Sequence, residues 1–153
     1  MKNPYMEQAI IEARKASDLG EVPVGAVIVY KGEIIARAHN LREKNNNALA
    51  HAEIIVIDEA CRRLKSWRLD DCELYVTLEP CPMCAGAIIN SRINSVYFGA
   101  FDLKGGACGS VVDLFIKGSF NHSPTVYGGI MEDACEDVLK DFFAYYHIDA
   151  NLN

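Results

Sequence analysis

The sequence contains no apolar run that approaches the length of a membrane span. Its first residues, Met1 to Tyr5, do not show the charged-then-apolar order of a secretory signal. Basic residues are in deficit, because 15 lysines and arginines stand against 21 aspartates and glutamates, for a formal net charge of -6. This balance argues against broad, charge-driven binding of nucleic acid, although a local basic patch is compatible with it. Because the sequence shows neither a membrane span nor a secretory signal, we expect a cytoplasmic protein.

Internal repeats, linkers and low-complexity segments are absent as well. A chain of 153 residues, of which 50% are hydrophobic, is long enough to bury a core without disulfide staples. In a cytoplasmic chain, six cysteines are more often ligands, catalysts or small buried residues than a disulfide framework. We expect a single domain over residues 1–153.

The hydrophobic pattern predicts alternating helices and strands. A helical period covers residues 6–19, and two strands at 24–30 and 33–39 should form an antiparallel hairpin around Lys31-Gly32. A polar loop at 40–50 leads into a helix that begins near His51. The remaining expected elements are a strand at 73–78, a helix to about Ser91, a strand at 94–100, a short helix at 111–116, an edge strand at 124–127 and a helix at 131–146.

The strand, helix and strand between residues 73 and 100 form a βαβ unit, which predicts two parallel strands with a right-handed crossover. Together with the hairpin, this unit predicts a mixed sheet of about five strands. Helices on both faces of the sheet would give a three-layer α/β/α domain.

Two cysteines occupy the point within residues 74–89 where a β-like apolar run gives way to a helical one. Pro82 suits the first position of a helix, so Cys81 and Cys84 fall in its first turn with both sulfurs on one face. The positive end of the helix favours thiolates there. The pair by itself is compatible with a catalytic zinc site, a structural zinc knuckle or a thioredoxin-like dithiol.

The segment His51-Ala52-Glu53 favours the first of these interpretations. One imidazole and two thiolates leave the fourth position of a tetrahedral zinc open, as in a catalytic site. Glu53 lies too close to His51 to share the metal comfortably, but near enough to move protons between water and substrate. A thioredoxin-like dithiol would use Cys81 and Cys84 but would assign no role to His51 and Glu53. A structural zinc site would need a fourth ligand.

His51-Ala52-Glu53 followed by Pro80-Cys81-Pro82-Met83-Cys84 resembles the signature of the cytidine and adenosine deaminase superfamily. Further segments, which together span nearly the whole chain, are similar to the bacterial tRNA-specific adenosine deaminases. They are residues 21–27, 75–81, 91–93, 98–100 and 109–110.

The resemblance implies a zinc-dependent hydrolase, a homodimer that converts adenosine to inosine at the wobble position of a tRNA anticodon loop. It implies one zinc ion per chain, held by His51, Cys81 and Cys84, with Glu53 as the proton shuttle. It also implies substrate contacts, in which Asn40 hydrogen-bonds the flipped nucleotide, Pro23, Val24 and Leu78 surround the base, and Asp102 lies near the loop ribose.

The chain departs from this family in its basic residues. Residues 142–153 contain no lysine or arginine where the family often has a basic run, and Ser123 stands where relatives often show arginine. Fewer phosphate contacts weaken RNA binding, so a deaminase of a free base or nucleoside (guanine, cytosine or cytidine) is the alternative function. The basic residues that remain as candidates for RNA phosphates are Arg42, Lys44, Arg62, Arg63, Arg68 and Lys104.

Overall fold

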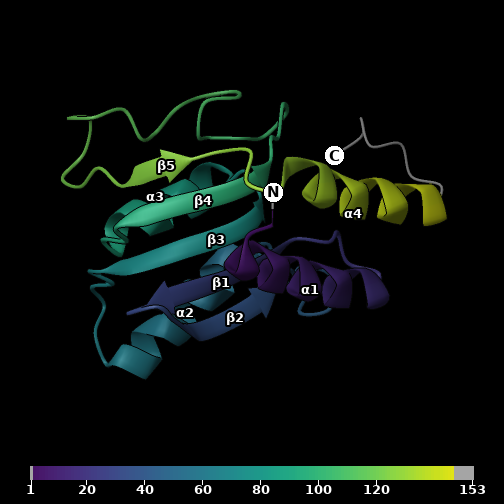
Figure 1. Ribbon diagram of the computed structural model, residues 1–153, viewed down its shortest axis with the longest axis horizontal. Coiled ribbons are helices and arrows are strands. Elements are labelled where there is room, and N and C mark those ends of the chain that lie inside the picture. The colour runs from purple at the N-terminus through teal and green to yellow at the C-terminus, as the bar shows by residue number, and fades with distance from the viewer. Residues whose placement is uncertain (1, 147–153) are drawn as a thin grey trace.

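The computed structural model describes residues 2–146, and residues 147–153 at the end of the segment without basic residues lie outside this range. A five-stranded sheet with the order β2-β1-β3-β4-β5 forms the centre of the domain (Figure 1). The elements in chain order are α1 (Pro4–Asp18), β1 (Gly25–Tyr30), β2 (Glu33–His39), α2 (Ala52–Leu64), β3 (Cys72–Leu78), α3 (Pro82–Asn90), β4 (Ser95–Ala100), β5 (Thr125–Tyr127) and α4 (Glu132–Tyr145).

The strand pairing confirms the predicted mixed sheet. β1 runs antiparallel to both β2 and β3, whereas β4 runs parallel to both β3 and β5. The β1–β2 turn consists of Lys31 and Gly32, which both have a positive φ, as a two-residue hairpin turn requires. The predicted parallel βαβ unit is present, with α3 as its crossover helix.

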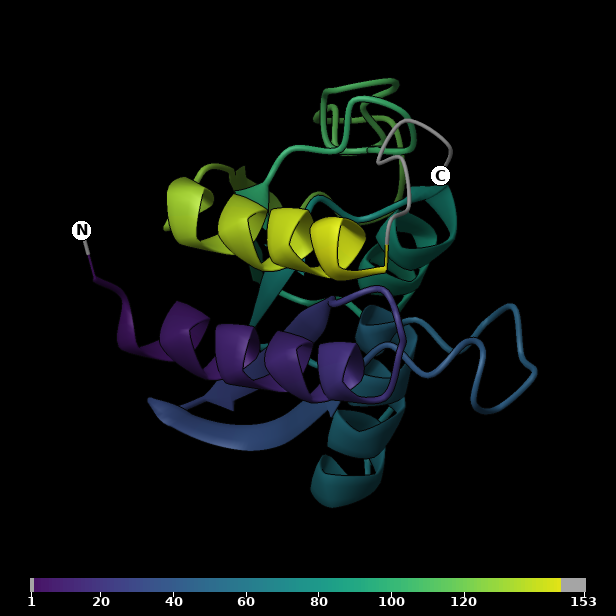
Figure 2. The ribbon, with the colours of Figure 1, turned by 90° about the vertical axis from the view of Figure 1, so that its right-hand side faces the viewer.

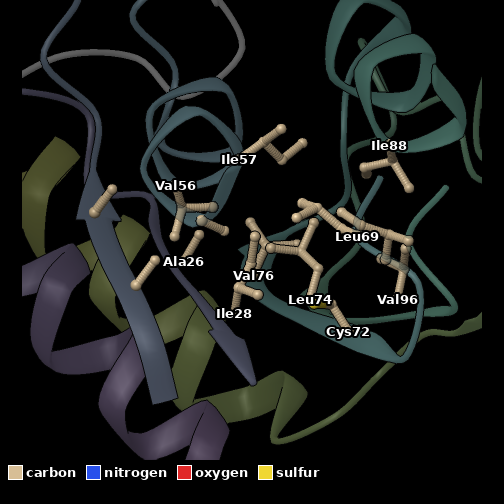
Figure 3. Close-up of a cluster of buried hydrophobic side chains, with 14 of the residues drawn as sticks. Ala26, Ile28, Val56, Ile57, Leu69, Cys72, Leu74, Val76, Ile88 and Val96 are labelled. Carbon is tan, nitrogen blue, oxygen red and sulfur yellow. The ribbon is translucent and has the colours of Figure 1, made fainter. Parts of the chain in front are cut away.

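Helices cover the two faces of the sheet in pairs. Figure 2 shows α1 and α4 on one face and α2 and α3 on the other. Successive side chains of β1 alternate between the layers, so that Ile28 packs with α2 and α3 while Val27 packs with α1 and α4. Figure 3 shows the larger cluster, where Val56 of α2 and Ile88 of α3 meet the sheet. The three-layer α/β/α fold predicted from the sequence is confirmed.

Stacked tyrosines extend the sheet to its short edge strand. Tyr75, Tyr97 and Tyr127 are paired in register across β3, β4 and β5. The ring centroids of Tyr75 and Tyr97 lie 4.5 Å apart, and those of Tyr97 and Tyr127 lie 4.9 Å apart. Such cross-strand aromatic pairs stabilise a sheet, which helps to explain how a strand of only three residues pairs here.

The prediction of a short helix at residues 111–116 is wrong, because this segment forms a bend, an isolated bridge between Asp113 and Cys108, and a turn. The backbone N–H of Val111 donates to Gly106 O and that of Leu114 to Ala107 O, so the segment folds back onto the preceding loop. Its valines are exposed and pack no helical face. Among the described residues, no helix has both the length and the apolar character needed to cross a membrane.

Candidate active site

The three predicted metal ligands come together at the starts of two helices. His51 is the N-cap of α2, Cys81 is the N-cap of α3, and neither side chain caps its own helix. Instead, His51 Nδ1 lies 3.7 Å from Cys81 Sγ and 3.6 Å from Cys84 Sγ. The carboxyl ends of β2 and β3 lie at the same edge of the sheet. The chain enters α2 after β2 and α3 after β3, so both helices begin near this edge.

The spacing of these three donors fits one metal ion. A tetrahedral zinc ion with bonds of about 2.3 Å to sulfur and about 2.1 Å to nitrogen separates such atoms by about 3.6 Å. All three donor atoms lie within 4.8 Å of one another. Within residues 2–146 the group comprises these three donors and no fourth, so a tetrahedral ion would keep one position open.

The two thiols share negative charge. Hydrogen bonds from Cys84 and then His51 lower the pKa of Cys81 to about 4, although burial opposes this shift. The adjacent Cys81 sulfur and burial raise the pKa of Cys84, and the hydrogen bond to Cys81 raises the pKa of His51. The thiolate form is therefore favoured at Cys81, the N-cap of α3, where the positive end of the helix also favours negative charge.

Glu53 is the second residue of α2 and lies beside His51, Cys81 and Cys84. Its side chain is 4% exposed, and burial raises its pKa to about 7. The nearby charge of Cys81 raises the pKa further, while His51 opposes the shift. A carboxyl group that exchanges its proton near neutral pH is suited to general acid–base chemistry.

A cavity of about 730 Å³ opens over these groups, within the range of about 300–1,000 Å³ that is common for ligand sites. Of the predicted substrate contacts, Asn40, Val24, Leu78 and Asp102 line it. Pro23 is buried and is not among the lining residues. His51, Cys81 and Glu53 also line the cavity, which places the predicted chemistry and most of the predicted contacts in one space.

Asn40 directs part of its amide at the cavity. Its Nδ2 donates to Val22 O at 3.1 Å, and its Oδ1 accepts from the backbone N–H of Arg42 at 3.1 Å. A side-chain amide has two N–H groups and two acceptor positions, so one of each remains for a ligand. Because Asn40 is buried and held at both ends, its orientation is set before any ligand binds.

Several residues of the cavity wall were not predicted from the sequence. Glu136, Leu139, Lys140 and Phe143 come from α4, which the sequence pattern marks only as an amphipathic helix. Glu79 lies in the family-like segment at 75–81 and had no predicted role, yet its carboxylate accepts hydrogen bonds from the loop at 101–110. Its signal in the sequence was an acidic residue among apolar ones, directly between β3 and the first cysteine.

The basic residues divide into two groups. Arg42 and Lys104 line the cavity, and Lys140 joins them from α4. Arg62 and Arg63 lie in the last turn of α2, about 16 Å along the helix from His51 at 1.5 Å per residue. They pair with Asp58 and Glu59 of the same helix. Arg68 pairs with Asp70, and Lys44 lies in the loop at 40–50; neither lines the cavity.

Comparisons with known proteins agree on one activity class. A family model described as MafB19-like deaminase matches residues 1–145. The chain is 57% identical over 139 residues to the tRNA-specific adenosine deaminase of Bacillus subtilis (strain 168), a match that covers 91% of this chain and 86% of that protein.

Solved structures of deaminases also superpose on the chain. A structure described as a study of A-to-I editing by tRNA:A34 deaminases at the wobble position superposes with a TM-score of 0.85 and 48% identity, covering 88% of this chain and 98% of the other. The guanine deaminase of Bacillus subtilis superposes with a TM-score of 0.62 and 28% identity, covering 97% of both chains. The chain is thus more similar to the enzymes that act on RNA than to this enzyme named for a free base.

Proposed function

The chain belongs to the family of tRNA-specific adenosine deaminases, and we propose that it hydrolyses adenosine to inosine at the wobble position of a tRNA anticodon loop. The resemblance noted in the sequence is confirmed at the level of the family. The observation that carries the proposal is that His51, Cys81 and Glu53 line one cavity, with Cys84 buried beside His51 and Cys81. Because the proposed substrate is tRNA, we place the enzyme in the cytoplasm.

We assign the metal as one zinc ion per chain, because two thiolates and an imidazole with an open fourth position are the donor set of a catalytic zinc site. A zinc ion held by His51, Cys81 and Cys84 would supply an activated water for attack on C6 of the adenine. Glu53 accepts a proton from this water and delivers it to the ring nitrogen. It then carries the second proton of the water to the departing amino group, so that adenosine and water yield inosine and ammonia.

The cavity walls suit a flat base with a polar edge. Val24 and Leu78 offer apolar surface to the ring, and Asn40 offers one donor and one acceptor. Asp102 is proposed to contact the ribose. Pro23 is proposed to act through its neighbour Val24, by fixing the backbone at that wall.

Asn40→Ala is expected to lower kcat/KM by about 5- to 150-fold, because hydrogen bonds of this kind contribute about 1–3 kcal/mol to a bound transition state. The metal content should stay at one ion per chain, since Asn40 does not touch the cluster. Steady-state kinetics with metal analysis measure both quantities. Unchanged kinetics would remove Asn40 from the substrate site.

The proposal is tested by comparing an anticodon-loop RNA with free adenosine, cytosine and guanine at matched concentrations, with released ammonia as the readout. We expect turnover of the RNA to exceed that of each small molecule, because an unpaired loop base is extracted at little cost and its phosphates add binding energy. Faster turnover of guanine would favour the free-base alternative, to which the structural similarity with guanine deaminase points.

Arg42, Lys104 and Lys140 provide a small basic rim for RNA phosphates, since they reach the cavity from three separate elements. Lys104→Ala and Lys140→Ala should each raise KM for RNA and reduce the slope of log kcat/KM against log salt by about 0.7 per lost phosphate contact. Arg63→Ala is the matched control, because this residue lies at the far end of α2. A slope that changes with Arg63 and not with the rim would contradict this assignment.

We also propose that the enzyme is a homodimer. The segment at 111–120 leaves large apolar side chains in solvent, namely those of Val111, Val112, Ile116 and Phe120. A second copy of the chain could cover such a surface. Sedimentation equilibrium measures the state, and a monomer at micromolar concentration would contradict the proposal.

A further inference from the structure

Two buried carboxylates outside the metal cluster, Glu21 and Glu79, each hold a loop that borders the cavity. Their side chains are 1% and 2% exposed, respectively. Burying a carboxylate is costly unless its oxygens are well hydrogen-bonded. The hydrogen-bond donors to Glu21 and Glu79 are mainly backbone N–H groups, and they show which segments the two carboxylates hold.

Glu79 uses both oxygens on the loop at 101–110. Its Oε1 accepts from the backbone N–H of Asp102 at 3.0 Å and from the Ser110 hydroxyl. Its Oε2 accepts from the backbone N–H of Cys108 at 3.0 Å and of Ser110 at 3.1 Å. A carboxylate has about four acceptor positions and no donor, so this set of four donors uses its full capacity.

The loop is packed directly against this carboxylate. A Cβ atom added at Gly106 would lie 2.3 Å from Cδ of Glu79, so only glycine allows this approach. Ala107 N also donates to Pro80 O at 2.8 Å. Within the loop, Asp102 Oδ1 accepts from the backbone N–H groups of Lys104 and Gly105. The hydrogen bond from Asp102 to Glu79 therefore also holds the turn that carries these cavity residues.

Glu21 makes the corresponding contacts at the loop at 40–50. Its Oε1 accepts from the backbone N–H of Glu43 at 3.1 Å, and its Oε2 accepts from that of Lys44 at 2.7 Å. This loop carries Asn40 and Arg42 into the cavity. Two of the loops that supply cavity residues, at 40–50 and 101–110, are thus each tied to one buried carboxylate.

We propose that Glu79, with Glu21 as its counterpart, is a positioning residue that sets the shape of the cavity before substrate binds. Without the Glu79 carboxylate, the loop at 101–110 leaves the conformation in which it is hydrogen-bonded to Glu79. Asp102 and Lys104 are then no longer held in their positions at the cavity. The kinetic consequence rests on the proposed function, whereas the order of the loop does not.

Glu79→Gln tests the proposal, because an amide keeps one oxygen and turns an NH2 group toward N–H donors. Amide hydrogen exchange at Asp102, Cys108 and Ser110 should accelerate by about tenfold or more, since local opening becomes easier when charge-assisted bonds are lost. KM for the loop RNA should rise by about tenfold, while kcat changes less and the metal stays at one ion per chain. Ser110→Ala removes one side-chain donor and should give a smaller effect of the same kind.

Glu12→Gln is the matched control, because Glu12 is also buried but accepts from the side chains of Lys15 and His39. It should leave exchange in the loop at 101–110 unchanged. Wild-type exchange and KM in Glu79→Gln would overturn the proposal, and so would loss of metal with an unchanged loop. If Glu79→Gln does not fold, exchange at Cys108 and Ser110 in Ser110→Ala decides. If the wild-type enzyme does not deaminate RNA, only the proposed function is overturned, since the amide hydrogen-exchange rates of the loop at 101–110 do not depend on substrate.

Discussion

Glu53→Gln is expected to reduce turnover by about 10²- to 10⁴-fold, the range that a positioned general acid–base group contributes. Glutamine has nearly the same shape as glutamate but cannot accept a proton from water or return it to the base. Because Glu53 lies beside the three proposed metal donors and is not one of them, the variant should keep its fold and its metal.

Single-turnover kinetics and metal analysis of the same sample separate the two effects. Glu59→Gln on the same helix is the control, since its side chain is 41% exposed and should not affect turnover. Loss of metal in Glu53→Gln would mean that Glu53 is a ligand, and near-normal turnover would remove it from the reaction.

Cys84→Ala is expected to remove both metal and turnover. Cys84 is fully buried at the start of α3, and its sulfur lies 3.6 Å from His51 Nδ1. Loss of a direct ligand should weaken metal binding by more than about 100-fold, because even the loss of a residue that only orients a ligand costs about 10- to 100-fold. Metal analysis after dialysis against a chelator measures the effect.

Cys72→Ala is the matched control, because Cys72 is equally buried but lies at the start of β3 in the apolar core. Burial raises the pKa of its thiol to about 11, so it should behave as a small hydrophobic residue. The Cys72 variant should keep its metal and activity. A wild-type protein that contains no metal, and whose Cys81 and Cys84 alternate between dithiol and disulfide, would favour the redox interpretation instead.

The sequence was sufficient for features that depend on local periodicity. The β1–β2 hairpin follows from alternating apolar residues around Lys31-Gly32, and α3 follows from Pro82 before an apolar helical run. The grouping of His51, Cys81 and Cys84, the proposed metal ligands, was predictable because each lies at a helix start. Their meeting in space follows from the βαβ order, which leaves few ways to arrange the neighbouring helices.

Long-range packing accounts for what the sequence did not predict. The segment at 111–116 contains helix-compatible apolar residues, but its backbone bonds to Gly106 and Ala107, in a loop whose conformation depends on Glu79. Similarly, an amphipathic pattern shows that α4 packs on one face but not that Lys140 reaches the cavity. Arg62 and Arg63 are adjacent basic residues in the sequence, yet the direction of α2 carries them away from the site.

The most direct measurement is mass spectrometry of the nucleosides and the ribonuclease fragments of an unmodified tRNA with adenosine at the first anticodon position, after incubation with the purified enzyme. We predict that inosine accumulates to one residue per tRNA, at the first anticodon position, and that Glu53→Gln forms none over the same period. Absence of inosine in tRNA, together with release of ammonia from free guanine or cytosine, would contradict the assignment of this chain as an RNA-editing enzyme.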